Sequence, residues 1–210
     1  MKQTFFLSAL LFLTIIAFSQ KKAITDTGEE VILYNDGTWK YANDSVDKEA
    51  EIATNPKPFK KSVSSSFLVK STNFNVGVWV DPKKWNFTKS VDNEAAEYEF
   101  TLKGKDLYGM MITEGLEIPL ETLKSIALDN AKDAAPDSKI IKQEYRNVNG
   151  KKVLCLHING TTEGIKFSYY GYYFSNEKGT LQFVTYTAQN LFEKYLPDME
   201  ELLNGLVEVN

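Results

Sequence analysis

Side chains that carry acid–base or redox chemistry near neutral pH are nearly missing from this chain of 210 residues. It contains one cysteine, Cys155, and one histidine, His157. A single cysteine cannot close a disulfide within the chain, so the fold must depend on its hydrophobic core. Zinc sites usually use several Cys and His ligands, which this composition does not supply. We therefore expect no metal site and no cofactor.

An excess of positive charge is missing as well. The chain has 24 basic and 28 acidic side chains, which gives a formal net charge of −4 at pH 7. Both nucleic acid and anionic lipid require a basic surface on the protein that binds them. We predict that the protein does not bind nucleic acid and that no electrostatic attraction holds it to anionic lipid.

Motifs of common catalytic sites are absent from the sequence. No Gly-x-Ser-x-Gly elbow, phosphate-binding loop, dinucleotide fingerprint or calcium loop occurs. Acidic side chains could flank a substrate as in a glycosidase, although solvated positions explain them more simply. These side chains are Glu94, Glu97, Glu99, Glu114 and Glu117.

Cys155 and His157 form the one pair with catalytic potential. The two residues are two positions apart on a predicted strand, so their side chains point to the same face at a spacing of about 7 Å. A thiol nucleophile also needs a lowered pKa and a third, orienting group. Apolar neighbours at 154, 156 and 158 instead indicate a core position. We predict that the protein is not an enzyme, with a hydrolase using Cys155 and His157 as the alternative.

The first 19 residues have the pattern of a cleaved secretory signal. Lys2 precedes an apolar run from Phe5 to Phe18, and small residues stand at Ala17 and Ser19. The run is shorter than the ~20 apolar residues that span a bilayer. No cysteine lies near the junction to carry a lipid. We predict cleavage after Ser19, no stable membrane anchor, and a periplasmic or secreted protein.

Three further segments follow the predicted signal. Residues 20–42 predict a β-hairpin, with the turn sequence Asn35-Asp36-Gly37 between two β-rich runs. Residues 43–61 are charged and contain Pro56 and Pro58, which is typical of a linker. Residues 62–210 predict one domain. An isolated hairpin is marginally stable, so it must pack on that domain, on a partner or on a copy of itself.

The periodicity of the domain predicts strands and two helices. One helix is expected over 119–135, with Pro119 at its first position. The other is expected over 190–206, with Asn190 and Glu193 as a capping box. Strands 151–158 and 165–174 are apolar on both faces, so they must lie in the middle of a covered sheet. The predicted fold is α+β, an antiparallel sheet flanked by helices as an α/β/α sandwich. The other strands are expected over 66–71, 75–80, 97–102, 107–113, 139–148 and 180–187.

Several segments resemble the PsbP-like fold family, which includes the photosystem II extrinsic protein and bacterial exported relatives. They are Val78–Trp85, Asn149-Gly150-Lys151, Tyr172-Tyr173-Phe174, Gln182–Thr187 and Phe192–Gly205. The resemblance covers about residues 62–210. Members of this family are mostly non-enzymatic, and they dock on protein assemblies or have no known role. The resemblance therefore implies a binding protein and transfers no catalytic residue.

Aromatic side chains are the candidates for binding. Trp39 and Tyr41 on the hairpin, together with Trp85, Tyr170 and Tyr172, could anchor a partner or line a cleft, with core packing as the alternative. We predict an exported module that binds a protein partner in the cell envelope. A small-ligand-binding protein with an aromatic cleft for a glycan, lipid or metabolite is the alternative.

Overall fold

The computed structural model describes residues 21–25, 28, 30–34, 37–41, 51–91 and 93–209. The chain divides into two compact units, residues 1–51 and 52–210. The predicted signal and its cleavage position lie outside the described residues. No helix in the described ranges is long and apolar enough to cross a membrane.

The small unit is a three-stranded antiparallel sheet in the order β1-β2-β3. Its strands are β1 (Lys21–Ile24), β2 (Glu30–Leu33) and β3 (Trp39–Tyr41). β2 pairs with β3 where the sequence predicted two strands of a hairpin, and Gly37 takes a positive φ of 84° before β3. β1 was not predicted, and it pairs with the other edge of β2.

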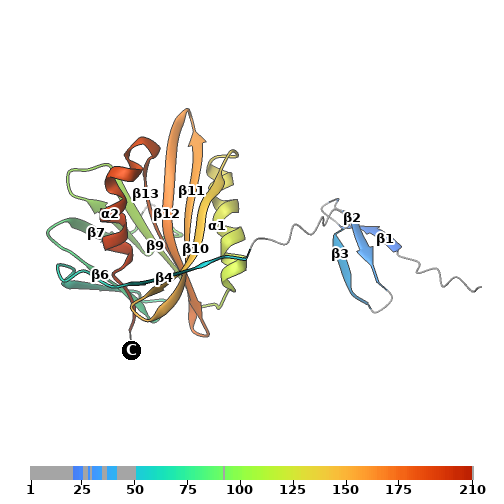
Figure 1. Ribbon diagram of the computed structural model, residues 1–210, viewed down its shortest axis with the longest axis horizontal. Coiled ribbons are helices and arrows are strands. Elements are labelled where there is room, and N and C mark those ends of the chain that lie inside the picture. The colour runs from blue at the N-terminus through green and yellow to red at the C-terminus, as the bar shows by residue number, and fades with distance from the viewer. Residues whose placement is uncertain are drawn as a thin grey trace, which may run out of the picture. The chain divides into compact units, whose positions relative to one another are not determined.

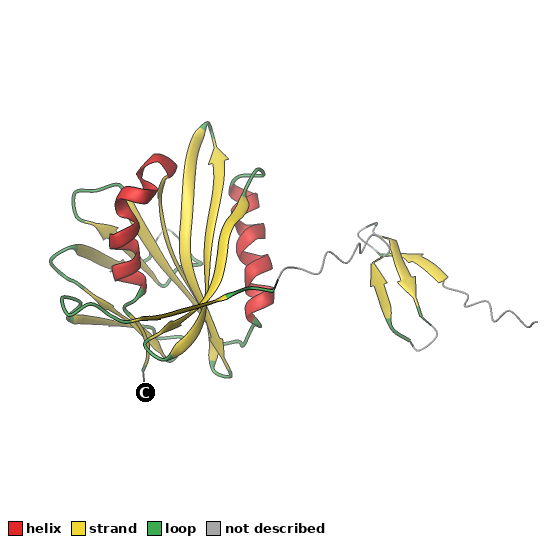
Figure 2. Ribbon diagram, in the orientation of Figure 1, coloured by secondary structure: helices red, strands yellow, loops and turns green. Residues whose placement is uncertain are grey.

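The large unit contains an eight-stranded sheet, a three-stranded sheet and two longer helices (Figures 1 and 2). In spatial order the large sheet comprises β4 (Thr54–Phe59), β10 (Lys139–Val148), β11 (Lys151–Thr162), β12 (Ile165–Asn176), β13 (Gly179–Ala188), β9 (Leu107–Glu114), β8 (Tyr98–Leu102) and β7 (Trp85–Lys89). The smaller sheet comprises β14 (Leu206–Glu208), β6 (Val76–Val80) and β5 (Phe67–Lys70). The helices are α1 (Leu120–Ala134) and α2 (Phe192–Leu203), the second preceded by a 3-10 turn over Gln189–Leu191. The mixed α+β class is therefore confirmed.

Tight turns fix the register of the long hairpins. Asn149 and Gly150 have φ angles of 49° and 84° between β10 and β11, as the Asn-Gly sequence predicts. The Asn149 side chain also donates hydrogen bonds to the backbone oxygens of Asn204 and Leu206, at 2.8 and 2.7 Å. One turn residue therefore ties this hairpin to the end of α2 and to β14.

Strand β4 corrects the predicted linker. Residues 54–59 pair in parallel with β10, and the large unit begins at Ile52 instead of residue 62. Pro56 and Pro58 are compatible with a strand here because β4 lies at the edge of the sheet, where one side needs no backbone donors. The prediction of a linker is wrong for these residues, while residues 42–50 lie outside the description.

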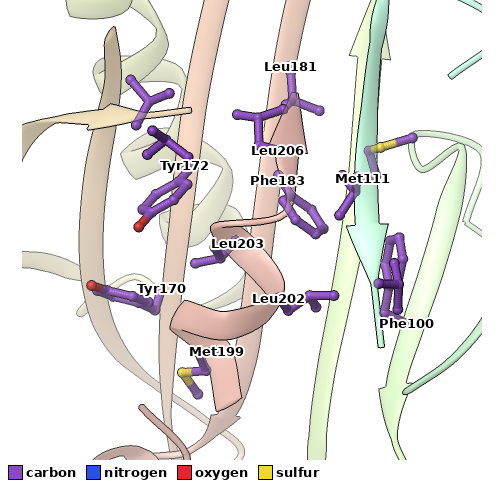
Figure 3. Packing of buried hydrophobic residues seen from close by; sticks show 14 of the residues in the cluster. Phe100, Met111, Tyr170, Tyr172, Leu181, Phe183, Met199, Leu202, Leu203 and Leu206 are labelled. Atoms are coloured by element: carbon purple, nitrogen blue, oxygen red, sulfur yellow. The ribbon is translucent and has the colours of Figure 1, made fainter. Parts of the chain in front are cut away.

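The two helices cover opposite faces of the large sheet (Figure 1). Alternation along β11 sends Leu154 and Leu156 into a cluster with α1, whereas Val153 and Cys155 join the cluster under α2. The second cluster also contains the valines of β6, so the smaller sheet closes the same side. Figure 3 shows Tyr172, Phe183, Met199, Leu202 and Leu203 meeting there. Burial on both faces explains why β11 and β12 are apolar throughout.

Helix α2 begins differently from the prediction. Its N-cap is Leu191, which makes no side-chain capping bond, so the expected capping box of Asn190 and Glu193 does not form. Pro197 lies inside the helix, and the helix ends at Asn204 before Gly205. A side chain at 205 would place its Cβ 2.1 Å from the backbone oxygen of Trp79, so only glycine fits this crossing.

Candidate functional site

Three of the five predicted contact residues lie in the core. Trp85, Tyr170 and Tyr172 are 2%, 4% and 0% exposed, and all three belong to the cluster under α2. Buried rings offer no surface to a partner or ligand, so this part of the prediction is corrected. Core packing, the alternative for the aromatic residues of strand 165–174, is what the structure shows for Tyr170 and Tyr172.

A buried polar network takes up the hydroxyls of two of these tyrosines. Arg146 donates to Glu144, Glu200 and the Tyr172 hydroxyl at 2.6, 2.9 and 3.0 Å, and Tyr170 donates to Glu200 at 3.0 Å. Burial disfavours the charged form of Glu144, but hydrogen bonds from Arg146 and Asn55 outweigh it and lower the pKa of Glu144. The network links β10 and β12 to α2, and its polar groups are occupied by one another.

Cys155 is buried and His157 is half-buried. Cys155 is 3% exposed, and burial raises the pKa of its thiol to about 11, so the thiol is protonated at neutral pH. The His157 ring stacks on Phe192 with centroids 4.0 Å apart, and burial lowers the pKa of His157. Its Nε2 is buried and has no hydrogen-bond partner in the described chain. A relay from histidine to thiol is not assembled.

Two of the carboxylate candidates, Glu97 and Glu99, bind hydrogen-bond donors of the protein. Glu97 accepts hydrogen bonds from Ser71, from Thr113 and from the backbone and hydroxyl of Thr72, at 2.6 to 2.8 Å. Burial opposes ionisation of Glu97, but these donors lower its pKa. Glu99 binds the Ser90 hydroxyl at 2.8 Å. Within the described ranges, no cluster of three His, Cys, Asp or Glu could hold a metal ion.

The small unit carries the two predicted contact residues that are exposed. Trp39 and Tyr41 are 54% and 40% exposed, and their rings meet edge to face with centroids 5.3 Å apart. Trp39 and Tyr41 are alternate residues of β3, so their side chains lie on the same face of the strand and form an exposed aromatic pair. Their role as partner contacts stays a prediction.

A groove lies on the α1 face of the large sheet, where the helix leaves part of the sheet uncovered. Its volume is about 310 Å³. β9, β11, β12 and β13 form its floor, α1 one wall, and the segment before β8 the other. None of the lining residues is charged. They are Asn93, Ala95, Met110, Ile112, Ala127, Asn130, Ala131, Ile158, Tyr169, Tyr173, Gln182 and Val184.

Two polar residues of the floor make no side-chain hydrogen bond within the described chain. Tyr173 and Gln182 are cross-strand neighbours on β12 and β13, and as whole residues they are 3% and 8% exposed. The Tyr173 hydroxyl and the Gln182 amide are not among the fully buried unpaired atoms of the described residues. What remains accessible of these two groups lies in the groove, where they can bond to solvent or to a ligand.

A row of tyrosines continues the floor across neighbouring strands. Tyr169, Tyr186 and Tyr108 are successive register partners on β12, β13 and β9. The Tyr169 and Tyr186 rings are 5.9 Å apart, and Tyr186 stacks on Tyr108 at 5.4 Å. Tyr108 is 37% exposed and the other two are half-buried. The row is an aromatic surface that begins in the groove and extends beyond it.

The sequence analysis named residues of β12, which does line the groove, but it named those on the opposite face of the strand. It named Tyr170 and Tyr172, whereas the groove uses Tyr169 and Tyr173 of the same strand. The alternation separates these two sets without showing which face a helix covers completely. The signal that could have helped was Gln182, a polar residue in a strand otherwise rich in apolar side chains.

The fold defines a mixed α+β protein. Its large unit has the PsbP-like fold. The cyanobacterial PsbP (CyanoP) from Synechocystis sp. PCC 6803 is similar with a TM-score of 0.51 and 13% identity, over 70% of this chain and 94% of that one.

Two other solved structures are similar at lower scores. LpqN of Mycobacterium tuberculosis, described as involved in cell envelope biogenesis, has a TM-score of 0.49 and 9% identity, covering 69% of this chain and 90% of that one. PA94 of Pseudomonas aeruginosa, described as of unknown function, has a TM-score of 0.44 and 13% identity, covering 69% and 99%. No protein-family model matches the sequence, and no curated protein does. At these identities the likeness concerns the fold alone.

Proposed function

We propose that this protein is an exported, non-enzymatic binding protein of the cell envelope that holds a small ligand in the groove beside α1. The observation that carries the proposal is the groove itself, whose floor contains the hydroxyl of Tyr173 and the amide of Gln182, neither of them bonded to another side chain. The signal pattern of residues 1–19 supports export. The helices on opposite sheet faces support the α/β/α arrangement, in which α1 borders the groove.

The chemistry of the lining supports binding without catalysis. Amides, phenols, a thioether and alkyl groups line the groove, and none of them is charged. Such a surface gives hydrogen bonds and apolar contacts, which are the features of a ligand pocket. The buried thiol of Cys155 and the fully engaged carboxylate of Glu97 also support a protein that does not turn over its ligand.

A bulky side chain at the groove mouth tests this function. Asn130 is exposed and lines the groove, so Asn130→Trp should fill it without disturbing the core. Asp129→Trp is the matched control, because Asp129 is exposed on the same helix and does not line the groove. Each protein is incubated with a small-molecule extract of the cell envelope, and retained compounds are identified by mass spectrometry.

We expect the original protein and Asp129→Trp to retain the same compound and Asn130→Trp to lose it. Equal retention by all three proteins would exclude the groove as the site. Retention of nothing by the original protein would count against a small-ligand function.

A protein partner that binds the small unit is the second candidate function, and the exposed rings of Trp39 and Tyr41 favour it. Exposed aromatic side chains are common anchors of protein interfaces. Full-length Trp39→Ser/Tyr41→Ser is cross-linked in the native cell envelope beside the original protein. We expect a defined cross-linked partner to be lost from the double variant. An unchanged set of cross-links would remove the small unit from recognition.

A further inference from the structure

We infer that the ligand of the groove is an uncharged saccharide, held by Gln182 and Tyr173 and stacked on the tyrosine row. The inference rests on the proposed binding function and specifies its ligand class. Three properties of the groove lead to it: polar groups without a protein partner on its floor, absence of charge in its lining, and an adjoining aromatic surface.

The unpaired polar groups exclude a purely apolar ligand. The Gln182 amide offers two donors and an acceptor, and the Tyr173 hydroxyl offers one donor and an acceptor. An alkyl chain in the groove would remove solvent from both groups and pair neither, which is unfavourable. Vicinal hydroxyls of a sugar donate and accept hydrogen bonds, so they can pair with both neighbouring groups.

The lining excludes strongly charged ligands. No Lys, Arg, Asp or Glu lines the groove. A phosphate, carboxylate or ammonium group would lose its hydration there without meeting an opposite charge. Asn93 and Asn130 on the two walls add further neutral amides. The hydrogen-bonding ligand must therefore be neutral.

The aromatic row matches the remaining surface of a sugar. The axial C–H groups of a pyranose make an apolar face that packs on an aromatic ring. Tyr169, Tyr186 and Tyr108 present three rings at successive spacings of 5.9 and 5.4 Å. A row of this length exceeds one sugar ring, so an oligosaccharide should bind more tightly than its monosaccharide unit.

Calorimetric titration of the full-length protein tests the ligand class. The neutral probes are maltotriose, cellotriose and triacetylchitotriose, with glucose as the monosaccharide. Trigalacturonic acid serves as the anionic probe and 1-octanol as the apolar probe. We expect one of the neutral trisaccharides to bind, and the anionic and apolar probes to give no heat.

Three substitutions locate the binding. Gln182→Leu should weaken the trisaccharide about tenfold or more, because it leaves sugar hydroxyls unpaired on burial. Tyr173→Phe should also lower the affinity for the trisaccharide, because it removes the hydroxyl. Gln143→Leu is the matched control, because Gln143 is another glutamine of the large sheet without a partner for its Oε1, but it does not line the groove. It should leave the affinity unchanged.

The outcomes separate this inference from the function on which it rests. Octanol binding that strengthens in Gln182→Leu would overturn the saccharide while retaining a groove that binds ligands. Trisaccharide binding that both Gln182→Leu and Tyr173→Phe leave unaltered would also overturn it. If no neutral saccharide binds but the Asn130→Trp comparison still shows a retained compound, the ligand class is wrong and the binding function stands.

Discussion

At the scale of single residues, the large unit contrasts occupied polar groups with unoccupied ones. On the α2 face, the side chains of Glu144, Arg146 and Glu200 are paired with one another. On the α1 face, Gln182 and Tyr173 lie in the groove and make no side-chain hydrogen bond within the described chain. The first set stabilises the protein, whereas the second is the set that the proposed binding function uses.

Glu144 should make the stability of the protein depend on acidity. Its pKa is lowered in the folded state, so its contribution is present above the ordinary glutamate pKa of about 4.3 and is lost as the pH falls through the lower, folded value. Glu144→Gln should cost about 3 kcal/mol at pH 7, because it leaves Arg146 partly unpaired in the interior. Between pH 5 and pH 3, the Glu144→Gln variant should also lose less stability than the original protein, because it has no carboxylate to protonate at this position.

Denaturant unfolding at several pH values measures both effects. The matched control is Glu117→Gln, at an exposed position. It should change the free energy of unfolding by less than about 0.5 kcal/mol. Parallel pH dependences for the original protein and Glu144→Gln would show that the network does not hold Glu144 ionised.

At the scale of elements, the edge strand β4 belongs to the folded unit and not to a tether. The backbone of Tyr145 donates to the oxygen of Ala53, and that of Asn149 donates to the oxygen of Phe59, both at 2.9 Å. The ring of Phe59 also lies 4.3 Å from the Arg146 guanidinium. β4 therefore covers both the edge of β10 and one side of the polar network.

Two truncated chains should differ sharply in stability. A chain that starts at residue 52 keeps β4, whereas one that starts at residue 62 exposes the edge of β10 and uncovers Arg146. We expect the shorter chain to unfold at least about 2 °C lower, since the lost contacts exceed about 1 kcal/mol and each kcal/mol shifts the midpoint of a domain of this size by about 2–4 °C. Differential scanning calorimetry of both chains measures this. Equal transition temperatures would show that β4 is dispensable.

Most elements were predictable because their local signals agree with their tertiary environment. β11 and β12 are apolar on both faces and lie in the middle of the sheet, and Pro119 precedes α1. β4 was missed because its two prolines are tolerated only at an edge, which the sequence does not reveal. β7 was missed because it directly follows the turn at Asp81, whose turn signals dominate the local sequence. β14 was missed because it directly follows α2, where the helix signals dominate.

At the scale of the whole molecule, the candidate site was less predictable than the fold. Aromatic residues on β12 pointed to a cleft, but the choice of face depends on how much of the sheet α1 covers. That coverage is decided by the crossover from β9 through α1 to β10, which brings the helix over one half of the sheet. Groove residues also come from β9, α1, β12 and β13, so no local segment contains their pattern.

The position of the lone thiol has a consequence for where this protein can work. Cys155 lies under α2, sealed by the core. While the fold persists, neither oxidants nor a second chain can reach its sulfur. The native structure is thus the same under reducing and oxidising conditions, and it requires no disulfide-forming or disulfide-shuffling enzyme. Crossing from the cytoplasm into an oxidising compartment would leave the covalent state of this protein unchanged.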